Sequence, residues 1–192
     1  MRRTLQPIEV RQVAPADAVE LAGLLNAIIG QGGTTALEDP FTPKQLGDTY
    51  LFGPAVHCCF VAVDRKTGRI EGFQTLGRYP ALPDNIGDIG TFTRIDGKQR
   101  GIGSALFAAT RKHSLELGLA ALNATIRADN VGGLAFYGKL GFVDHGVTRA
   151  VPLKDGAPVD RVHKRHDLGA QELSRHGNFR ISFHHACPGR SG

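Results

Sequence analysis

The chain has 192 residues, enough for one compact α/β domain that needs no disulfide or metal to hold its core. Hydrophobic residues make up 41% of the sequence, which excludes a mostly disordered chain. No apolar run has the length of a membrane span, and the first residues lack the apolar core of a signal peptide. We therefore expect a cytoplasmic protein with no membrane partner.

Charge and composition argue against two further classes of function. The formal net charge is +5, but Lys and Arg are spread along the chain and only 7% of residues are aromatic, so we expect no nucleic-acid partner. A moderately basic surface suits a polyanionic cofactor equally well. The 8 histidines show no metal-ligand spacing, and we predict no metal. Cys58 and Cys59 lie in an apolar run that predicts buried thiols.

The first half of the chain predicts amphipathic helices and an antiparallel hairpin. Apolar residues recur at three- and four-residue steps from Val19 to Ile29, as on one face of a helix. Thr42 is a typical N-cap ahead of Pro43, and Arg65–Gly68 is a turn-forming segment between two strand-like runs. The expected elements are a strand over Ile8–Val13, helices from Asp17 to Ile29 and from Pro43 to Phe52, and strands over His57–Asp64 and Glu71–Arg78.

The second half predicts a strand–helix–strand unit followed by a further helix and two strands. Asp155 and Gly156 supply a turn before the last strand, and periodicity is lost from Gly169 onward. We therefore predict a single domain over 1–168 and a C-terminal tail over 169–192 that is partly disordered. The expected elements are strands over Ile89–Ile95, Ala120–Ile126, Phe142–Thr148 and Arg161–Leu168, and helices over Ser104–Leu117 and Val131–Leu140.

Residues 98–104, Lys-Gln-Arg-Gly-Ile-Gly-Ser, form a glycine-rich turn that follows a strand and opens a helix. Unpaired backbone N–H groups at a helix N-terminus attract anions, and Gly101 and Gly103 let an anionic group approach the main chain. Neither a dinucleotide motif, which wants glycine where Leu106 stands, nor a P-loop fits this turn. A purely structural glycine turn remains an alternative on these residues alone.

A second pattern follows the next predicted strand, at residues 130–142, Asn-Val-Gly-Gly-Leu-Ala-Phe-Tyr-Gly-Lys-Leu-Gly-Phe. Together the two segments resemble the core motifs of the GNAT acetyltransferase superfamily, Q/R-x-x-G-x-G/A and N-x-x-A-x-x-hydrophobic-Y-x-x-x-G-F. Both motifs stand in the right order and spacing across Ile89 to Val147. The chain departs from them at Lys98, where Gln or Arg is usual, and at Gly133, where Ala is usual.

The resemblance implies a fold and, more loosely, a branch of the superfamily. The implied fold is a mixed α+β sandwich: a central, largely antiparallel sheet that splays between its fourth and fifth strands and is flanked by helices. Asn26, Thr34–Glu38 and Pro40–Pro43 resemble the phosphinothricin and L-amino-acid N-acyltransferase branch. Homodimer formation is left open.

The resemblance also implies acetyl-CoA as co-substrate and assigns residues to hold it. Splaying of the sheet would leave backbone groups free for the pantetheine arm, here those of Thr91, Phe92 and Thr93. Asn130 would bind pantetheine or orient the second motif, while a plain helix N-cap explains an Asn at this place equally well. The pyrophosphate would lie on the backbone of Gln99, Arg100, Gly101, Ile102, Gly103 and Ser104.

Tyr137 is the candidate general acid in this pattern, because a phenol is protonated at neutral pH and can give its proton to a departing thiolate. An aromatic side chain on an apolar helix face is the alternative interpretation. Glu38 is the candidate general base that the branch resemblance suggests, although a solvated loop carboxylate fits it as well. Asp88 is a weaker alternative for the base, and His57 and His145 are further options with ordinary surface or core interpretations.

These assignments predict an N-acetyltransferase that moves an acyl group from acetyl-CoA directly to the primary amine of a small molecule, such as an amino acid. Two other classes remain open. One is a protein or peptide N-acetyltransferase, which would need an open groove. The other is a non-catalytic domain that binds acyl-CoA, which would keep the glycine turn and lose the acid. Retention of Tyr137 favours an enzyme.

Overall fold

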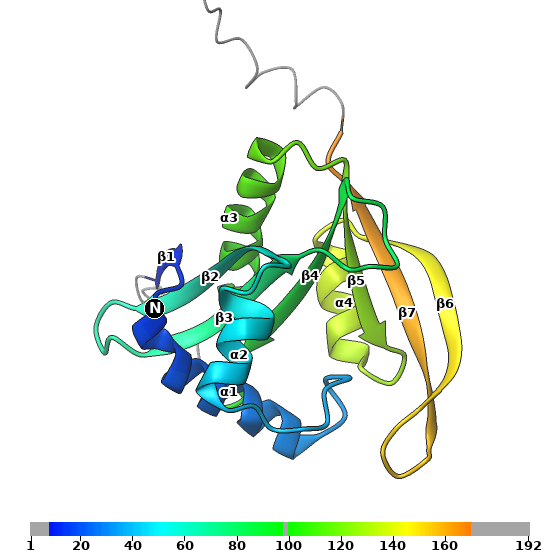
Figure 1. Cartoon of the computed structure of the whole chain (residues 1–192), viewed down its shortest axis with the longest axis horizontal. Coiled ribbons are helices and arrows are strands. Elements are labelled where there is room, and N and C mark those ends of the chain that lie inside the picture. Colours follow the sequence, from blue (N-terminus) through cyan, green and yellow to red (C-terminus); the bar gives the residue numbers. More distant parts are fainter. Residues whose placement is uncertain (1–7, 98–99, 170–192) are drawn as a thin grey trace, which may run out of the picture.

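The computed structural model describes residues 8–97 and 100–169. A seven-stranded sheet runs through it in the order β1-β2-β3-β4-β5-β7-β6 (Figure 1). The strands are β1 (Ile8–Gln12), β2 (Val56–Asp64), β3 (Ile70–Gly77), β4 (Ile86–Thr93), β5 (Ala121–Arg127), β6 (Val143–Pro152) and β7 (Pro158–Asp167). The helices are α1 (Ala18–Gln31), α2 (Pro43–Leu46), α3 (Ile102–Glu116) and α4 (Val131–Lys139), with a 3₁₀ turn at Pro15–Asp17 and a π turn at Gly47–Leu51.

The sheet lies between two helical layers. Successive side chains of its strands point to opposite faces, so each face presents apolar side chains to a layer of helices. In β2, Cys59 and Val61 pack with Leu25 of α1 in one core cluster. Cys58 points to the other face, where it packs in a second cluster with residues of α3 and α4, among them Tyr137. Both thiols are buried, which confirms that prediction. The helices α1 and α2 therefore cover one face, and α3 and α4 the other.

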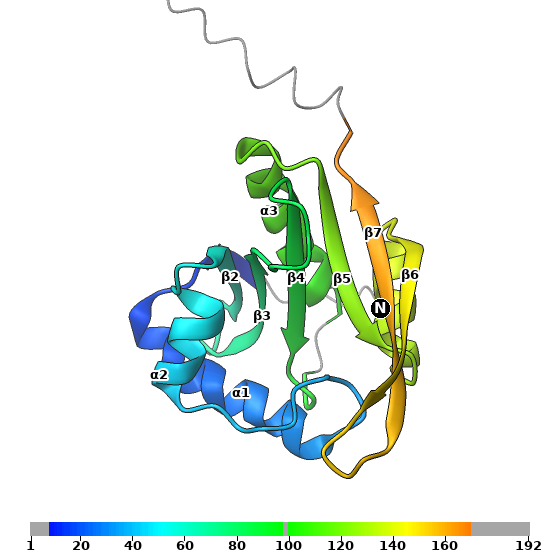
Figure 2. The same cartoon turned by 45° about the vertical axis from the view of Figure 1, so that its right-hand side comes forward.

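All strand pairs are antiparallel except β4 with β5, which run parallel. That parallel pairing is short, because it joins only Ile86–Asp88 to Ala121–Asn123. Beyond Asp88 the two strands diverge toward their C-terminal ends (Figure 2). This is the splayed, largely antiparallel sheet that the resemblance predicted, and the splay lies between the fourth and fifth strands as expected.

Three predicted strands, β4, β6 and β7, have clearly different bounds in the structure. β7 begins at Pro158, before the predicted start at Arg161, because Pro158 and Val159 pair with β6. β4 begins at Ile86, before the predicted start at Ile89, because Ile86 and Gly87 pair with β5. β6 runs on to Pro152 rather than ending near Thr148, because it folds back on β7 through a bulge in the register before the turn. Local sequence patterns missed these three extensions, since pairing with another strand decides them.

The described residues contain no helix that is long and apolar enough to cross a membrane. Within the same part of the chain, no group of three or more His, Cys, Asp or Glu side chains could hold a metal ion. Lys98, Gln99 and residues 170–192 lie outside the described part of the chain, so the predicted tail stays a prediction.

Deleting residues 169–192 should leave the fold and acetyl-CoA binding intact. Leu168, the residue after β7, is 1% exposed, and its backbone N–H donates to the carbonyl of Ala120 at 2.9 Å. This contact anchors the end of the domain. Thermal unfolding of the truncated protein, with and without acetyl-CoA, tests the boundary. Loss of a cooperative transition would show that the domain extends past Leu168.

Candidate active site

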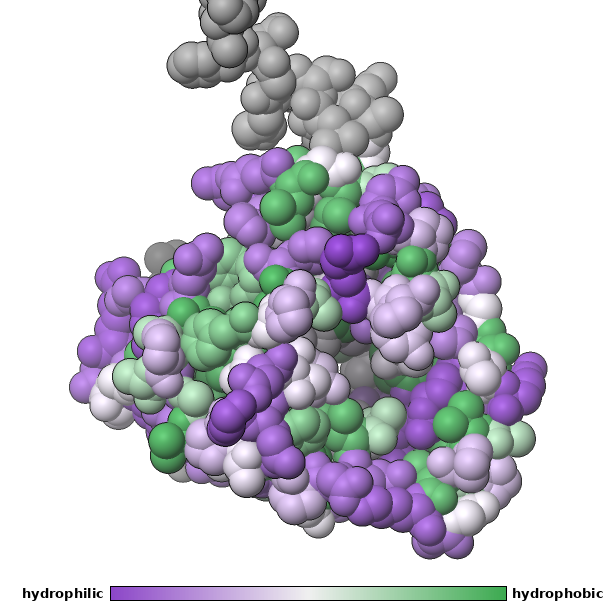
Figure 3. All heavy atoms as spheres, in the orientation of Figure 1, coloured by the Kyte–Doolittle hydropathy of each residue, from purple (hydrophilic) through white to green (hydrophobic). Residues whose placement is uncertain are grey.

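A cavity of about 1420 Å³ opens where β4 and β5 diverge. It is larger than the sites that usually hold one drug-sized ligand, so it has room for a long cofactor and a second substrate. The surface is hollowed in this region in the space-filling view (Figure 3). Most of the residues predicted to bind the cofactor line it: Thr91, Phe92, Thr93, Gly101, Ile102, Gly103, Ser104 and Asn130.

The first turn of α3 has the form expected of an anion site. Gly101, its N-cap, has a φ of 87°, and no side chain caps the helix. A Cβ atom at Gly101 would meet no heavy atom within 4 Å, so the main chain stands open there. The N–H groups of this turn are thus left for an anion at the positive end of the helix dipole. Arg100 is exposed beside the turn and does not line the cavity, and Gln99 lies outside the described residues.

Gly103 has a packing role that the sequence did not suggest. A Cβ atom there would come within 2.6 Å of the ring of Phe136, so the space is filled by α4 rather than left for phosphate oxygens. Gly103 therefore allows α3 and α4 to approach each other closely. Phe136 itself lines the cavity, which couples this packing to the site.

A Gly103→Val change should therefore destabilise the protein by about 1–3 kcal/mol through overpacking. It should also remove the stabilisation by acetyl-CoA, because displacement of Phe136 disturbs the cavity wall and the first turn of α3. Thermal melts with and without acetyl-CoA measure both effects. Gly23→Val is the matched control, since Gly23 lies in α1 and a Cβ there would meet nothing within 4 Å. A full ligand-induced shift in Gly103→Val would contradict this role.

The edge of β4 that faces β5 is open along the cavity. β4 pairs with β3 from Asp88 to Thr93 on its other edge, whereas its pairing with β5 ends at Asp88. Backbone groups of a strand point alternately to its two edges, so part of those between Ile89 and Thr93 have no strand partner. An extended amide-bearing chain can bind such an edge as an added strand would.

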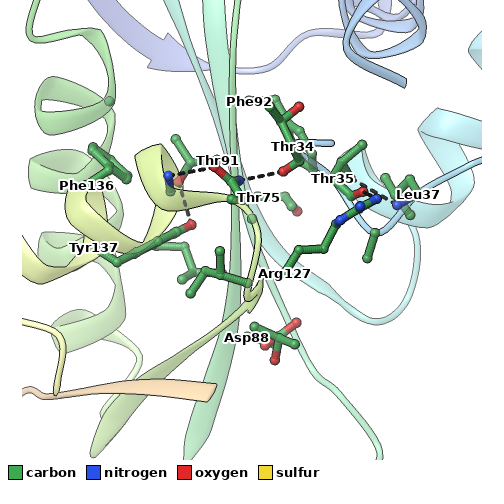
Figure 4. Close-up of a pocket in the computed structure, with 18 of the residues that line it drawn as sticks. Thr34, Thr35, Leu37, Thr75, Asp88, Thr91, Phe92, Arg127, Phe136 and Tyr137 are labelled. Carbon is green, nitrogen blue, oxygen red and sulfur yellow. Dashed lines mark hydrogen bonds between the residues drawn. The ribbon is translucent and has the colours of Figure 1, made fainter. Parts of the chain in front are cut away.

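Tyr137 lies on the α3–α4 side of this opening, where its hydroxyl is 2.9 Å from Oγ1 of Thr91 (Figure 4). Burial raises the pKa of Tyr137 to about 12, so the phenol stays protonated at neutral pH. Nε2 of the fully buried Gln74 donates to the same Thr91 oxygen at 2.7 Å. With one lone pair of Thr91 engaged, its hydroxyl can donate to Tyr137 and leave the phenolic proton for another acceptor.

Asp88 lines the cavity from the other side of the sheet, next to the point where the strands separate (Figure 4). It pairs in register with Asn123 of β5, whose amide donates to Oδ1 of Asp88 at 2.7 Å. Burial raises the pKa of Asp88 above its ordinary value, and the hydrogen bond from Asn123 opposes that rise. A carboxylate of raised basicity thus faces the cavity opposite Tyr137.

The other candidates for a general base lie elsewhere or have other partners. Both oxygens of Glu38 accept the backbone N–H of Lys154, at 3.1 and 3.2 Å, and Glu38 does not line the cavity. His57 does not line it either, and burial lowers the pKa of its imidazole. His145 of β6 does line the cavity. Of the carboxylates considered from the sequence, the structure brings only Asp88 to the cavity.

Asn130 is the N-cap of α4, as one of the two sequence interpretations predicted. Its Oδ1 accepts the backbone N–H of Gly133 at 2.8 Å. Its Nδ2 donates to the carbonyl of Thr34 at 2.7 Å and so holds the segment after α1 against the cavity. A Cβ atom at Gly133 would lie 2.6 Å from Nδ2 of Asn130, which explains why glycine suits this position better than the usual alanine.

A polar wall of the cavity, made by β5 and β7, was missed from the sequence. Thr125 and Arg127 of β5 pair in register with His163 and Arg161 of β7, and all four line the cavity. Their two-residue spacing on both strands is the signal that could have placed them on one face. His163 is hydrogen-bonded on both ring nitrogens, to the hydroxyls of Thr125 at 3.0 Å and of Thr148 at 2.7 Å.

A comparison against protein families agrees with the splayed sheet that the structure shows. Residues 31–142, more than half of the chain, match the acetyltransferase (GNAT) family. The chain belongs to this family. A comparison with curated proteins finds no match.

Several solved structures of bacterial proteins have a fold similar to that of this GNAT domain. A phosphinothricin acetyltransferase from Sinorhizobium meliloti, in complex with AcCoA, is 20% identical with a TM-score of 0.72, over 84% of this chain and 89% of that chain. The putative acetyltransferase yncA from Salmonella typhimurium, with its cofactor acetyl-CoA, is 14% identical with a TM-score of 0.72, over 85% and 95%. A ribosomal-protein-alanine N-acetyltransferase from Brucella melitensis is 18% identical with a TM-score of 0.70, over 83% and 99%.

Proposed function

We propose that this GNAT domain transfers the acetyl group of acetyl-CoA to the primary amine of a small molecule, in the cytoplasm. The observation that carries the proposal is the placement of a phenol and a carboxylate on opposite sides of the splay. Tyr137 reaches it from the α3–α4 side, where the anion-binding turn lies, and Asp88 from the side covered by α1 and α2. A thioester held along the open edge of β4 would lie between them.

Each group has one role in the transfer. The amine attacks the thioester carbonyl, and a free backbone N–H of β4 stabilises the negative charge that develops on the carbonyl oxygen. The C–S bond breaks, and Tyr137 gives its proton to the departing thiolate. Asp88 accepts a proton from the attacking nitrogen, directly or through one water molecule. The products are the N-acetyl amide and CoA, Asp88 releases its proton to solvent, and Tyr137 regains one from solvent.

The described cysteines favour direct transfer over an acetylated enzyme. Burial raises the pKa of Cys58 to about 12, and the pKa of Cys59 is raised further. A thiolate is the nucleophilic form, so both side chains are inert at neutral pH. Neither lines the cavity. Cys187 lies outside the described residues.

The proposed function is tested by measuring free thiol release from acetyl-CoA with a panel of small primary amines. We expect at least one amine to accelerate release well above the rate with water alone, with a rate that saturates in both substrates. A Tyr137→Phe variant serves as the control for release that does not use this site. Equal release with and without every amine would overturn the proposal.

A further inference from the structure

A row of hydrogen-bonded side chains crosses four strands on the acceptor side of the cavity. It begins at Asp88 of β4, whose Oδ1 accepts from Nδ2 of Asn123 at 2.7 Å. The same nitrogen donates to Oγ1 of Thr125 at 3.2 Å, and that oxygen lies 3.0 Å from Nδ1 of His163. Nε2 of His163 lies 2.7 Å from Oγ1 of Thr148, on the edge strand β6. All five residues line the cavity, and we call them the polar row.

Strand alternation places the polar row on the face that α1 and α2 cover. Leu122 and Ala124 of β5 pack in the core cluster that contains α3 and α4 residues. Asn123, which lies between them, and Thr125 therefore point to the opposite face. Thr125 pairs in register with His163, and residues directly opposite each other in an antiparallel pair share a face. The row therefore lies on the side from which Asp88 reaches the splay.

The donors and acceptors of the polar row fit one consistent arrangement. Both hydrogens of the Asn123 amide are used when Nδ2 donates to Asp88 and to Thr125. The hydroxyl of Thr125, having accepted that hydrogen, is left to donate to Nδ1 of His163. A neutral imidazole then carries its hydrogen on Nε2 and donates it to Thr148. The imidazole thus fixes the hydroxyl of Thr125, and this hydroxyl fixes which atom of the Asn123 amide faces Asp88.

The orientation of Asn123 matters because its amide donates the hydrogen bond that Asp88 accepts within the described residues. Burial raises the pKa of Asp88, whereas this hydrogen bond and the charge of His163 lower it. An amide turned the other way would present its oxygen to the carboxylate. The pKa of Asp88 would then rise further, and the carboxylate would lose the contact that holds it in place.

Other titratable and charged side chains lie around the two ends of the polar row. Tyr50 of the π turn and Tyr137 of α4 are close enough to Asp88 for its charge to add to the effect of burial in raising the pKa of each phenol. Near His163, the neighbouring groups of β5, β6 and β7 are Arg127, His145, Arg161 and Arg165. Asp129 pairs with Arg127 and also acts on Arg161, and Asp167 pairs with Arg165. Within the described residues none of these groups is hydrogen-bonded to Asp88 or to His163, so the polar row is the direct link between the two.

From this geometry we propose that His163 is a positioning residue for the transfer: through Thr125 it orients the amide of Asn123 and so holds Asp88 in place to accept the proton of the amine. The inference deepens the proposed function and rests on its assignment of Asp88 as the base. His163 acts through its neighbours, because hydroxyl groups engage both of its ring nitrogens.

Three substitutions separate the polar row from a simple effect of charge. His163→Leu removes the hydrogen bonds and the charge, Thr125→Val breaks the row and keeps the imidazole, and His163→Gln keeps a donor and an acceptor without the charge. We expect His163→Leu and Thr125→Val to lower kcat by on the order of 3- to 10-fold, with an unchanged KM for acetyl-CoA. Because the pKa of Asp88 rises in both, activity should be lost at a higher pH as pH is lowered. His163→Gln should recover most of the rate.

His113→Leu is the matched control, because it removes an imidazole of α3 that lies 3.3 Å from a carboxylate oxygen of Glu116 and does not line the cavity. It should change neither the rate nor the acidic limb of the pH profile. An acidic limb that stays in place in both His163→Leu and Thr125→Val would overturn the inference and leave the row a structural feature of the sheet. A limb that moves equally in His163→Leu and His163→Gln but not in Thr125→Val would also overturn it, because the charge of His163 would then act without the row.

Carbon-13 NMR of the aspartate carboxyl groups separates failure of this inference from failure of the proposed function. The signal of Asp88 is identified by its absence in Asp88→Asn. Its titration midpoint should move to higher pH in His163→Leu and Thr125→Val, less in His163→Gln, and not in His113→Leu. If no amine accelerates thiol release, the proposed function fails, and this midpoint still decides whether the row acts on Asp88. The same midpoint in all variants would overturn the inference even in an active enzyme.

Discussion

Replacement of Tyr137 by Phe should lower kcat by on the order of 10²- to 10⁴-fold, because the leaving thiolate loses its proton donor. The ring packing with Phe136 and Phe142 is retained, and only the hydrogen bond to Thr91 is lost. The free energy of unfolding should therefore change by no more than about 1 kcal/mol. Acetyl-CoA affinity should stay near that of the wild type. Single-turnover rates are the proper measurement, since slow product release would hide part of the defect.

Thr91→Val keeps the phenol of Tyr137 and removes its hydrogen bond to Thr91, together with the hydrogen bond that Thr91 accepts from Gln74. We expect a smaller loss than in Tyr137→Phe. The pKa of about 12 at Tyr137 also means that its deprotonation adds no alkaline limb to the rate profile at mildly alkaline pH. An unchanged single-turnover rate in Tyr137→Phe would remove Tyr137 from the mechanism and restore its interpretation as a core aromatic.

An Asp88→Asn change should lower kcat/KM by on the order of 10²- to 10⁴-fold if Asp88 is the general base. The amide keeps the size of the side chain and an oxygen that can accept from Asn123, so acetyl-CoA binding and melting temperature should change little. A base acts in its ionised form, and burial raises the pKa of Asp88. Wild-type activity should therefore fall, as pH is lowered, at a higher pH than an ordinary aspartate would give. This limb should disappear in Asp88→Asn.

Asp167→Asn controls for a general effect of charge, because Asp167 is exposed, pairs with Arg165 and does not line the cavity. Its rate and pH profile should match those of the wild type. If Asp88→Asn keeps both the rate and the acidic limb, Asp88 is not the base. His145, the other candidate at the cavity, is then the next residue to test by the same profile.

The sequence predicted most of the elements, the turn before α3 and the cap of α4, because those depend on local patterns. A few neighbouring residues are enough to indicate the glycine turn, the cap at Asn130 and the alternation in β2. Even there, the packing role of Gly103 was missed, since the ring of Phe136 comes from a helix more than thirty residues along the chain. A contact between side chains and backbone of two different helices cannot be recognised in the sequence of either helix alone.

The acceptor side of the cavity could not be predicted in the same way, because strands that are far apart in the sequence form it. Asp88 faces its partner Asn123 through a parallel pairing, and Arg127 faces Arg161 through an antiparallel one. Glu38 was the first candidate for the base from the sequence and Asp88 the weaker alternative, but the carboxylate of Glu38 accepts the backbone N–H of Lys154 and does not line the cavity. Only the register of the sheet decides which polar residues meet, and register is a property of the whole fold.

The central claim is most directly tested by mass spectrometry of the products after incubation with acetyl-CoA and each member of the panel of small primary amines. We predict an amine heavier by one acetyl group on its nitrogen, formed in equal amount with free CoA and strongly reduced in both Tyr137→Phe and Asp88→Asn. Free CoA that appears without any acetylated amine across the amine panel, or product whose yield is untouched by both substitutions, would contradict the account.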